Sequence, residues 1–313
     1  MKHQINSSDN LLPSEVDLFI CSNGFEERWK KILLTTHCKY AKEIYLIERF
    51  NSSSHSDVNY QGVDIENITI VDVLDSDQVT QWNNIFTKIT SKIQSMNEAK
   101  VVIDITCIPQ LTLYAIICQL HLLNLNKNIT FTYSGASKYN IESISSSDSS
   151  INRLSTVLGY PGVSTPSCNK QHLILLVGFD FDLAKTLIRD LEPTSISLGL
   201  GNSAFQGEFH EINSKYLKKI KNFASTQVAE GKITTFEFSC SDYQDAKESI
   251  SKEIIKHNDK NIVMCSMNTK VSSIASAKSA LENDSVKMCH IEPIFRSISD
   301  YSKDSDMISI FSL

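Results

Sequence analysis

The sequence has few of the features that mark several common functional classes. Only 10 of its 313 residues are glycine, and it contains no Walker-type phosphate loop. No apolar stretch reaches the roughly 18 residues that are needed to cross a bilayer. None of the eight cysteines forms a Cys-x-x-Cys pair, and no His-Glu-x-x-His motif is present. We therefore expect no membrane span, no metal and no cofactor.

The chain also lacks an excess of positive charge. It carries 30 basic and 36 acidic residues, which gives a net charge of −6. Non-specific binding to duplex nucleic acid is therefore not expected, although a few local donors could still hold a small anion. The first 13 residues contain no signal-peptide pattern. Cysteines without a disulfide-like spacing fit a reducing compartment, so a cytoplasmic location is expected.

Short apolar runs do occur, and they alternate with helical patterns along the chain. In the clearest case, residues 101–106 run through β-branched residues to Asp104 and Thr106, and Pro109 then introduces an apolar helix. This alternation is typical of parallel α/β sheets. The expected strands are 16–20, 44–47, 68–74, 101–106 and 129–133, followed by 172–177, 195–200, 233–238, 261–265 and 286–291.

The two series of strands match in order, and residues 67–77 resemble residues 232–242 locally. We therefore predict an α/β protein with two tandem Rossmann-like three-layer domains, mainly parallel sheets and an internal duplication. The first domain is expected at 14–150 and the second at 171–313. A linker is expected at 151–170, where glycine and proline cluster.

In the first domain, polar residues follow the first and fourth strands, whose carboxyl ends meet at one edge of such a sheet. The candidate ligand-binding residues are Ser22, Asn23, Gly24, Arg28, Asp104 and Thr106. Asp104 has two interpretations: it faces a ligand or acts as a general base, or it only fixes its own turn. Arg28 likewise either contacts a ligand or forms a surface ion pair with a neighbouring glutamate.

The second domain offers the corresponding turns after its own first and fourth strands. The candidates there are Gly178, Asp180, Ser266, Asn268, Thr269 and Lys270. At the start of a helix, free backbone N–H groups and the dipole favour an anion, and Lys270 could hold a phosphate as a point charge. The alternative is that Ser266 and Asn268 cap the helix and that Lys270 is solvated.

Two other patterns carry less weight. Residues 199–204 fit a G-x-G-x-x-A pattern, but they follow the second strand of their domain rather than the first, so dinucleotide binding is not expected. Cys21, Cys107 and Cys265 lie at strand ends, but no histidine has a spacing that would pair with them. We therefore do not expect covalent cysteine catalysis.

Several of these turns resemble the CRISPR-associated Rossmann fold (CARF) and the related SAVED sensor domains. Residues 266–270 are similar to the family's glycine-threonine-lysine turn, with Asn268 in place of the glycine. Residues 104–106 resemble an aspartate-x-threonine variant of that turn, and residues 19–24 resemble the small polar turn after strand one. This resemblance implies a tandem sensor for a nucleotide signal in a prokaryotic anti-phage or stress system, acting through a separate effector or as a homo-oligomer.

The leading expectation is therefore a non-catalytic regulatory protein that binds a small nucleotide-like anion. Two alternatives stay open. One is a nucleotide or phosphodiester hydrolase that uses Asp104 as acid or base. The other is a non-catalytic scaffold subunit of a multi-protein defence complex, which a broad apolar surface would indicate.

Overall fold

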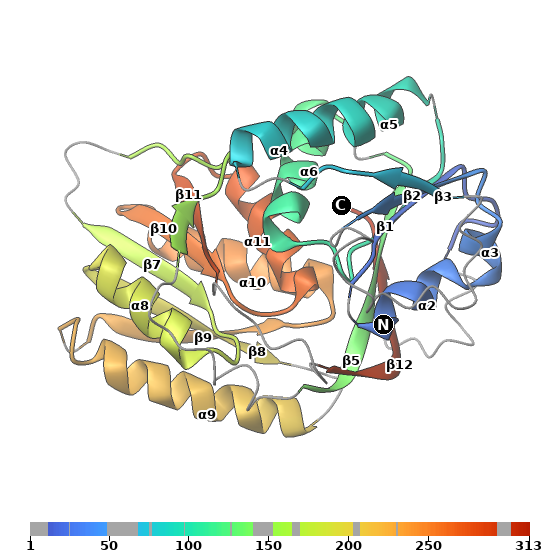
Figure 1. Ribbon diagram of the computed structural model, residues 1–313. Helices are drawn as coiled ribbons and strands as arrows, with labels where there is room; N and C mark the ends of the chain where they lie inside the picture. The colour runs from blue at the N-terminus through green and yellow to red at the C-terminus, as the bar shows by residue number, and fades with distance from the viewer. Residues whose placement is uncertain are drawn as a thin grey trace. The chain divides into compact units, whose positions relative to one another are not determined.

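The computed structural model describes residues 12–24, 26–48, 68–74, 77–96, 98–125, 127–139, 153–164, 170–202, 207–229, 231–292 and 302–313. The chain forms two compact units. Unit 1 comprises residues 1–139 together with 302–313, and unit 2 comprises residues 140–301. Each unit contains one six-stranded sheet (Figure 1).

The sheet of unit 1 has the order β12-β5-β4-β1-β2-β3. Its first five strands in the chain are parallel, and β12 pairs antiparallel with β5. The strands are β1 (Leu18–Ser22), β2 (Glu43–Ile47), β3 (Ile68–Val71), β4 (Val101–Asp104), β5 (Ile129–Tyr139) and β12 (Ser302–Phe311). β1 and β4 are buried along their whole length, as expected for central strands with both faces covered.

Helices cover this sheet between the strands. They are η1 (Glu27–Trp29), α2 (Lys30–Leu33), α3 (Thr36–Lys39), α4 (Gln78–Ile85), the π-helical turn η3 (Phe86–Thr90), α5 (Ser91–Ser95) and α6 (Gln110–Leu122). Trp29 and Ile32 pack with Phe19, Cys21 and Val102 in one apolar cluster. This cluster places the chain that follows β1 against the face of the sheet on which Cys21 lies.

The sheet of unit 2 has the order β6-β11-β10-β7-β8-β9. Five strands are again parallel, and β6 pairs antiparallel with β11. The strands are β6 (Arg153–Thr156), β7 (Gln171–Leu176), β8 (Ser195–Asn202), β9 (Ile233–Ser239), β10 (Asn261–Ser266) and β11 (Val286–Glu292).

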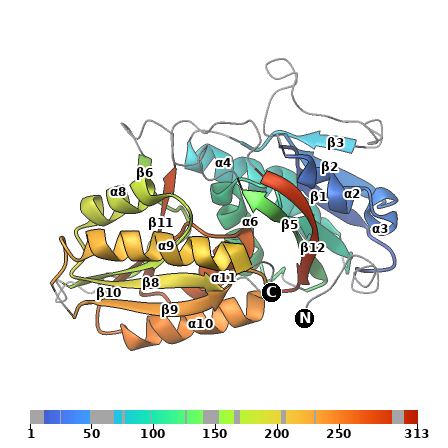
Figure 2. The same cartoon turned by 90° about the horizontal axis from the view of Figure 1, so that it is seen from below.

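The described residues of unit 2 form the helices α8 (Phe181–Leu191), α9 (Gly207–Ala224), α10 (Tyr243–Lys256) and α11 (Lys270–Leu281). Figure 2 shows α8 and α9 on one side of the sheet and α10 on the other. Leu183 and Leu187 of α8 and Ile220 of α9 pack on alternate apolar residues of the strands. This arrangement is the three-layer architecture of a Rossmann-like unit.

The predicted fold class is confirmed: the chain is an α/β protein with two mainly parallel sheets. The two strand orders coincide when β1–β5 are matched with β7–β11 and β12 with β6. The parallel strands in each unit follow the order 3-2-1-4-5 of a doubly wound sheet.

The structure divides the chain differently from the sequence prediction at two segments. Residues 302–311, expected in the second domain, form β12 in unit 1. Residues 153–156, expected in the linker, form β6 in unit 2. Ile308 is buried and the ring of Phe311 stacks on Phe131 at 5.7 Å, so apolar contacts hold β12 on its sheet.

Candidate functional site

In each unit the first and fourth parallel strands are neighbours. β1 pairs with β4, and β7 pairs with β10. Each pair is the point where the strand order reverses, and ligands of open α/β sheets bind outside the carboxyl ends of the strands at this point. The predicted turns of each unit therefore start from adjacent strands.

In unit 1, Asp104 holds the turn that follows β4. Its Oδ1 accepts hydrogen bonds from the Thr106 backbone N–H at 3.1 Å and from the Thr106 hydroxyl at 2.6 Å. Thr106 Oγ1 in turn accepts from the backbone N–H of Ser134 on β5 at 2.9 Å. Asp104 is only 1 % exposed. The carboxylate therefore fixes its own turn within a closed cluster.

Burial also changes the acidity of this carboxyl group. Loss of hydration raises the pKa of Asp104 to about 7, while the hydrogen bonds from Thr106 and the charge of Arg28 oppose this rise. Thr132 lies opposite Asp104 in the register between β4 and β5. The buried hydroxyl of Ser134 has no hydrogen-bond partner within the described residues. The sequence prediction missed these two β5 residues, since nothing marks them before the register is known.

Arg28 is buried and ties together several parts of unit 1. It pairs with Glu26, donates from Nη1 to the carbonyl of Ser134 at 2.6 Å, and donates from Nε to the Ser302 hydroxyl at 3.1 Å. Its guanidinium also lies over the ring of Tyr139 at 5.9 Å. The ion-pair interpretation is correct about the partner, but the pair is buried rather than on the surface.

The turn after β1 closes against its neighbours. The Ser22 hydroxyl donates to the carbonyl of Ile47 at 3.0 Å, and the Asn23 N–H donates to the same carbonyl at 3.2 Å. A Cβ on Gly24 would lie 3.1 Å from the Cys107 Sγ, so this turn packs tightly against the turn after β4. Unit 1 thus brings its predicted residues to one edge. Asp104 and Thr106 bind one another there, whereas Ser22, Asn23 and Arg28 bind neighbouring residues that the sequence did not single out.

In unit 2, the turns after β7 and β10 touch directly. A Cβ on Gly178 would lie 1.8 Å from the carbonyl oxygen of Met267, so no larger residue fits without displacing the backbone. The Met267 N–H also donates to the carbonyl of Leu176 at 3.0 Å. The two predicted turns therefore form one packed edge.

Asn268 links this edge to the neighbouring strands. Its Nδ2 donates to the carbonyl of Val177 at 2.6 Å, and its Oδ1 accepts from the N–H of Thr269 at 2.8 Å and from the Cys240 Sγ at 3.0 Å. The side chain thus joins the ends of β7 and β10 with the residue that follows β9. This bridging role explains an asparagine at this position without a ligand.

Of the other predicted residues of unit 2, two cap helices and two lie at or near the start of α11. Asp180 accepts from the Leu183 N–H at 3.0 Å at the start of α8. Thr269 is the N-cap of α11 and also donates to the carbonyl of Cys240 at 2.8 Å. Ser266 is buried, with its hydroxyl 3.3 Å from that of Ser273. Lys270, half-buried, is the first residue of α11.

The same edge contains a residue that the sequence did not identify as a candidate. Asn213 of α9 is 2 % exposed, its Nδ2 donates to the carbonyl of Gly201 at 3.3 Å, and its Oδ1 has no hydrogen-bond partner in the described ranges. A Cβ on Gly201 would lie 2.9 Å from the Asn268 Nδ2. The rejected G-x-G-x-x-A segment therefore belongs to this edge, although it follows the second strand of the unit.

A second polar cluster of unit 2 lies between the sheet and α10. His172 is fully buried, with Nδ1 2.8 Å from the Ser195 hydroxyl and Nε2 2.9 Å from the Ser197 hydroxyl. Ser197 donates to Glu253 Oε1 at 2.6 Å, and the ring of His257 stacks on that of His172 at 3.7 Å. Burial, with the charges of His257 and Lys260, lowers the pKa of His172 to about 3. The enclosure of His172 and Glu253 fits a structural role.

The described cysteines are poorly suited to act as nucleophiles. All seven are buried. Burial raises the pKa of Cys38 and of Cys240 to about 12 and raises that of Cys21 as well. In addition, no group of three or more His, Cys, Asp or Glu side chains in the described part of the chain is placed to hold a metal ion.

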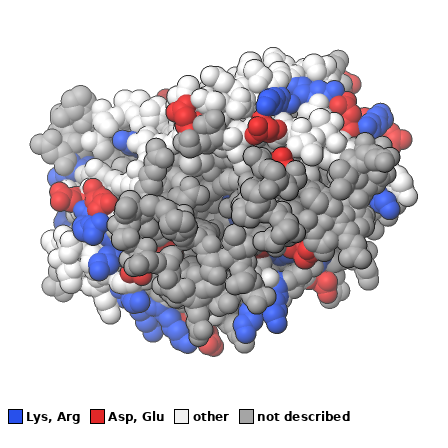
Figure 3. All heavy atoms as spheres, viewed as in Figure 1, with Lys and Arg blue, Asp and Glu red and all other residues white. Residues whose placement is uncertain are grey.

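The described surface carries charges of both signs. On the face shown in Figure 3, acidic and basic side chains both occur across the described surface. No helix among the described residues is both long enough and apolar enough to cross a membrane.

The fold and its two edges define the class: an α/β protein with two Rossmann-like units. No family model matches the chain, and no curated protein matches it. Among solved structures, UDP-GlcNAc 2-epimerase from Methanocaldococcus jannaschii aligns over 86% of this chain and 91% of its own, with 9% identity and a TM-score of 0.25. A likeness of this strength carries no argument about function.

Proposed function

We propose that the protein is a non-catalytic nucleotide-sensing or regulatory component of a prokaryotic anti-phage or stress system. It binds a small anionic, nucleotide-like ligand at the carboxyl edge of unit 2 and acts through a separate effector protein or a second copy. The observation that carries the proposal is the direct packing of the Gly178 turn on Met267, at the strand pair where doubly wound sheets bind ligands.

The helices that follow β7 and β10 differ in charge at their first turns. Asp180 places a carboxylate at the start of α8, which disfavours an anion there. α11 starts with a threonine cap and Lys270 and has no acidic residue in its first turn. The anionic group of the ligand is therefore best accommodated at the start of α11, close to the positive end of the helix dipole and an ammonium.

Asn213 supplies a second recognition element at the same edge. Its buried Oδ1 is an acceptor without a partner among the described residues, and an unsatisfied buried acceptor costs free energy. An amino group of a nucleobase would satisfy it. A molecule with an anionic part and an amino-bearing base thus fits both features, as the resemblance to CARF and SAVED sensors implies.

The test is calorimetric titration of the protein with cyclic oligonucleotides, nucleotides and NAD derivatives. Lys270→Ala should weaken binding of the active compound by about tenfold or more, because a charge-assisted contact is worth about 1.5–3 kcal/mol. Lys221→Ala, at an exposed position of α9, is the matched control and should bind like the wild type. The proposal would be contradicted if no compound bound, or if Lys270→Ala bound the active compound as tightly as the wild type.

A further inference from the structure

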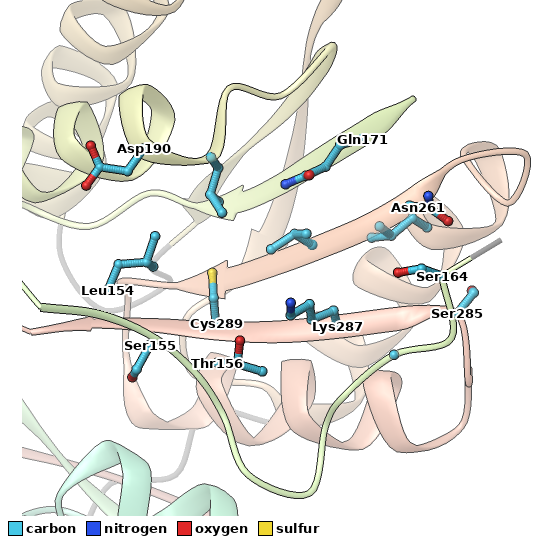
Figure 4. Close-up of a pocket in the computed structure, with 14 residues that line it drawn as sticks. Leu154, Ser155, Thr156, Ser164, Gln171, Asp190, Asn261, Ser285, Lys287 and Cys289 are labelled. Atoms are coloured by element: carbon cyan, nitrogen blue, oxygen red, sulfur yellow. The ribbon is translucent and has the colours of Figure 1, made fainter. Parts of the chain in front are cut away.

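A pocket of about 460 Å³ lies in unit 2, at the amino ends of β7, β10 and β11. This end of the sheet is opposite to the carboxyl edge at which Lys270 lies. Figure 4 shows Gln171 and Asn261 near the starts of their strands, Lys287 beside Cys289, and Asp190 on α8 across from them. The volume is in the lower part of the range for ligand pockets, so it suits a small ligand.

The topology explains why this part of the sheet is open. α8 and α9 pack on one face of the sheet, where α9 lies over β8 and α8 contacts α9 and β11. After Glu292, the described chain resumes only at Ser302, in the sheet of unit 1. No helix follows β11 among the described residues, and the amino-terminal half of β10 and β11 is bordered there by the end of α8, at Asp190 and Leu191, and by the loop after β6.

One wall of the pocket is held rigidly. The loop after β6 runs along β11, with the Val157 N–H donating to Met288 at 3.0 Å and the Met288 N–H donating to Tyr160 at 3.2 Å. Gly162 has a φ of +59°, and a Cβ there would lie 2.6 Å from the backbone nitrogen of Lys287. This loop therefore contacts β11 as closely as a glycine permits, which shapes the pocket before any ligand binds.

The polar groups of this pocket differ from those at the carboxyl edges. The side chains of Ser164, Gln171, Ser285 and Lys287 make no hydrogen bond or ion pair with any part of the chain that the structure describes. Lys287 is nevertheless half-buried. Asp190, the acidic residue of the lining, pairs instead with Arg189 at 2.9 Å. The pocket thus presents one unneutralised ammonium with amide and hydroxyl groups around it.

We propose that this pocket binds a polyhydroxylated molecule of monosaccharide size that carries one anionic group. The anion contacts Lys287, and the hydroxyls exchange hydrogen bonds with Gln171, Ser164 and Ser285, which can both donate and accept. A phosphate or a carboxylate would serve equally as the anion. This site is separate from the proposed nucleotide site and does not depend on it.

The experiment titrates the full chain with glucose 6-phosphate, gluconate, glucose and inorganic phosphate, with binding followed by calorimetry. Glucose 6-phosphate or gluconate should bind at submillimolar concentration, and glucose and phosphate alone more weakly by about tenfold or more. If glucose 6-phosphate binds tighter, the natural ligand is a sugar phosphate; if gluconate binds tighter, it is a sugar acid. Lys287→Met should reduce binding of the anionic sugar by about tenfold or more, without changing that of glucose. Lys221→Met is the matched control.

A second variant keeps the test valid if Lys287→Met does not fold. Gln171→Leu replaces the amide at the first residue of β7 with an apolar side chain of similar size. This variant should weaken the binding of glucose and of the anionic sugar alike. Equal binding by wild type, Lys287→Met and Gln171→Leu would overturn the proposal, as would the absence of binding by every probe. Binding that falls in Lys270→Ala but not in Lys287→Met would place the sugar at the carboxyl edge and would also overturn it.

Discussion

Single residues at the carboxyl edges largely bind their own turns. Asp104 accepts both hydrogen bonds of Thr106, and Asn268 joins the ends of β7 and β10 with the residue after β9. Such contacts fix backbone groups that a ligand would otherwise have to order itself. Preorganisation of this kind is consistent with a binding site, and it also means that polar residue type alone does not identify which side chains face a ligand.

Asp104 should make the stability of unit 1 depend on pH. Its folded-state pKa of about 7 lies above the ordinary value, so the folded unit retains a proton that the unfolded chain loses. Stability should therefore fall as pH rises from about 4 to about 7, by up to about 4 kcal/mol. Hydrogen exchange of unit 1 amides at pH 5 and pH 8 measures this change. Asp104→Asn should abolish it, and a slope that persists in the variant would contradict the assignment.

His172 should give unit 2 the opposite dependence. Its folded-state pKa of about 3 lies below the ordinary value, so the unfolded chain takes up a proton first. Stability should fall as pH drops below about 6.5, by about 2 kcal/mol at pH 5. His257, Glu253, Lys256 and Lys260 face this group and set the size of the effect.

Hydrogen exchange of the β7 and β8 amides between pH 7 and pH 5 would measure the loss for wild type and for His172→Gln. The glutamine variant should be less stable at pH 7 but lack the steep loss toward pH 5. His37→Gln, at a partly exposed position of unit 1, is the control. Identical pH profiles for wild type and His172→Gln would show that another group is responsible.

At the scale of elements, the ten parallel strands could be predicted from the sequence because each is a short apolar run. β6 and β12 could not, since they are edge strands whose residues are largely polar, as in 302–306. The carboxyl-edge turns were predicted because parallel strands end on one side. The pocket at the amino ends was not predicted, because it depends on where the Gly162 loop and the end of α8 lie beside β11.

The packing of the turns after β7 and β10 predicts a large effect of one methyl group. Gly178→Ala would force the Met267 carbonyl away from its place and should destabilise unit 2 by about 3 kcal/mol. At Gly135 the nearest atom would lie at 3.4 Å, an ordinary contact, so Gly135→Ala should change stability by less than about 1 kcal/mol. The urea midpoints of the two variants measure this difference. Equal midpoints would show that the turns after β7 and β10 rearrange at little cost.

At the scale of the whole molecule, each sheet takes its antiparallel edge strand from the segment after the other sheet's fifth parallel strand. β6 follows β5 in the chain but joins unit 2, and β12 follows β11 but joins unit 1. A single cut between β5 and β6 therefore leaves unit 2 with all six strands of its sheet but leaves unit 1 without β12.

Removal of residues 302–313 should therefore destabilise unit 1 rather than unit 2. It would expose β5 as a new edge and remove the Phe311 ring from Phe131 and the Ser302 hydroxyl from Arg28. Hydrogen exchange should rise in β5 and β4 and stay unchanged in β7 and β10. A synthetic peptide of residues 302–313 should restore protection when added. Faster exchange in unit 2 instead would contradict the assignment of β12.

The exchanged edge strands also set an order on synthesis. Translation runs from the N-terminus, so the ribosome releases β1–β5 long before β12 exists. Unit 2 has its edge strand, β6, ahead of its other five, so its sheet can close as soon as β11 emerges. The nascent first sheet must wait with β5 unpaired, which makes that strand a place where chaperones would act or where two growing chains would mispair.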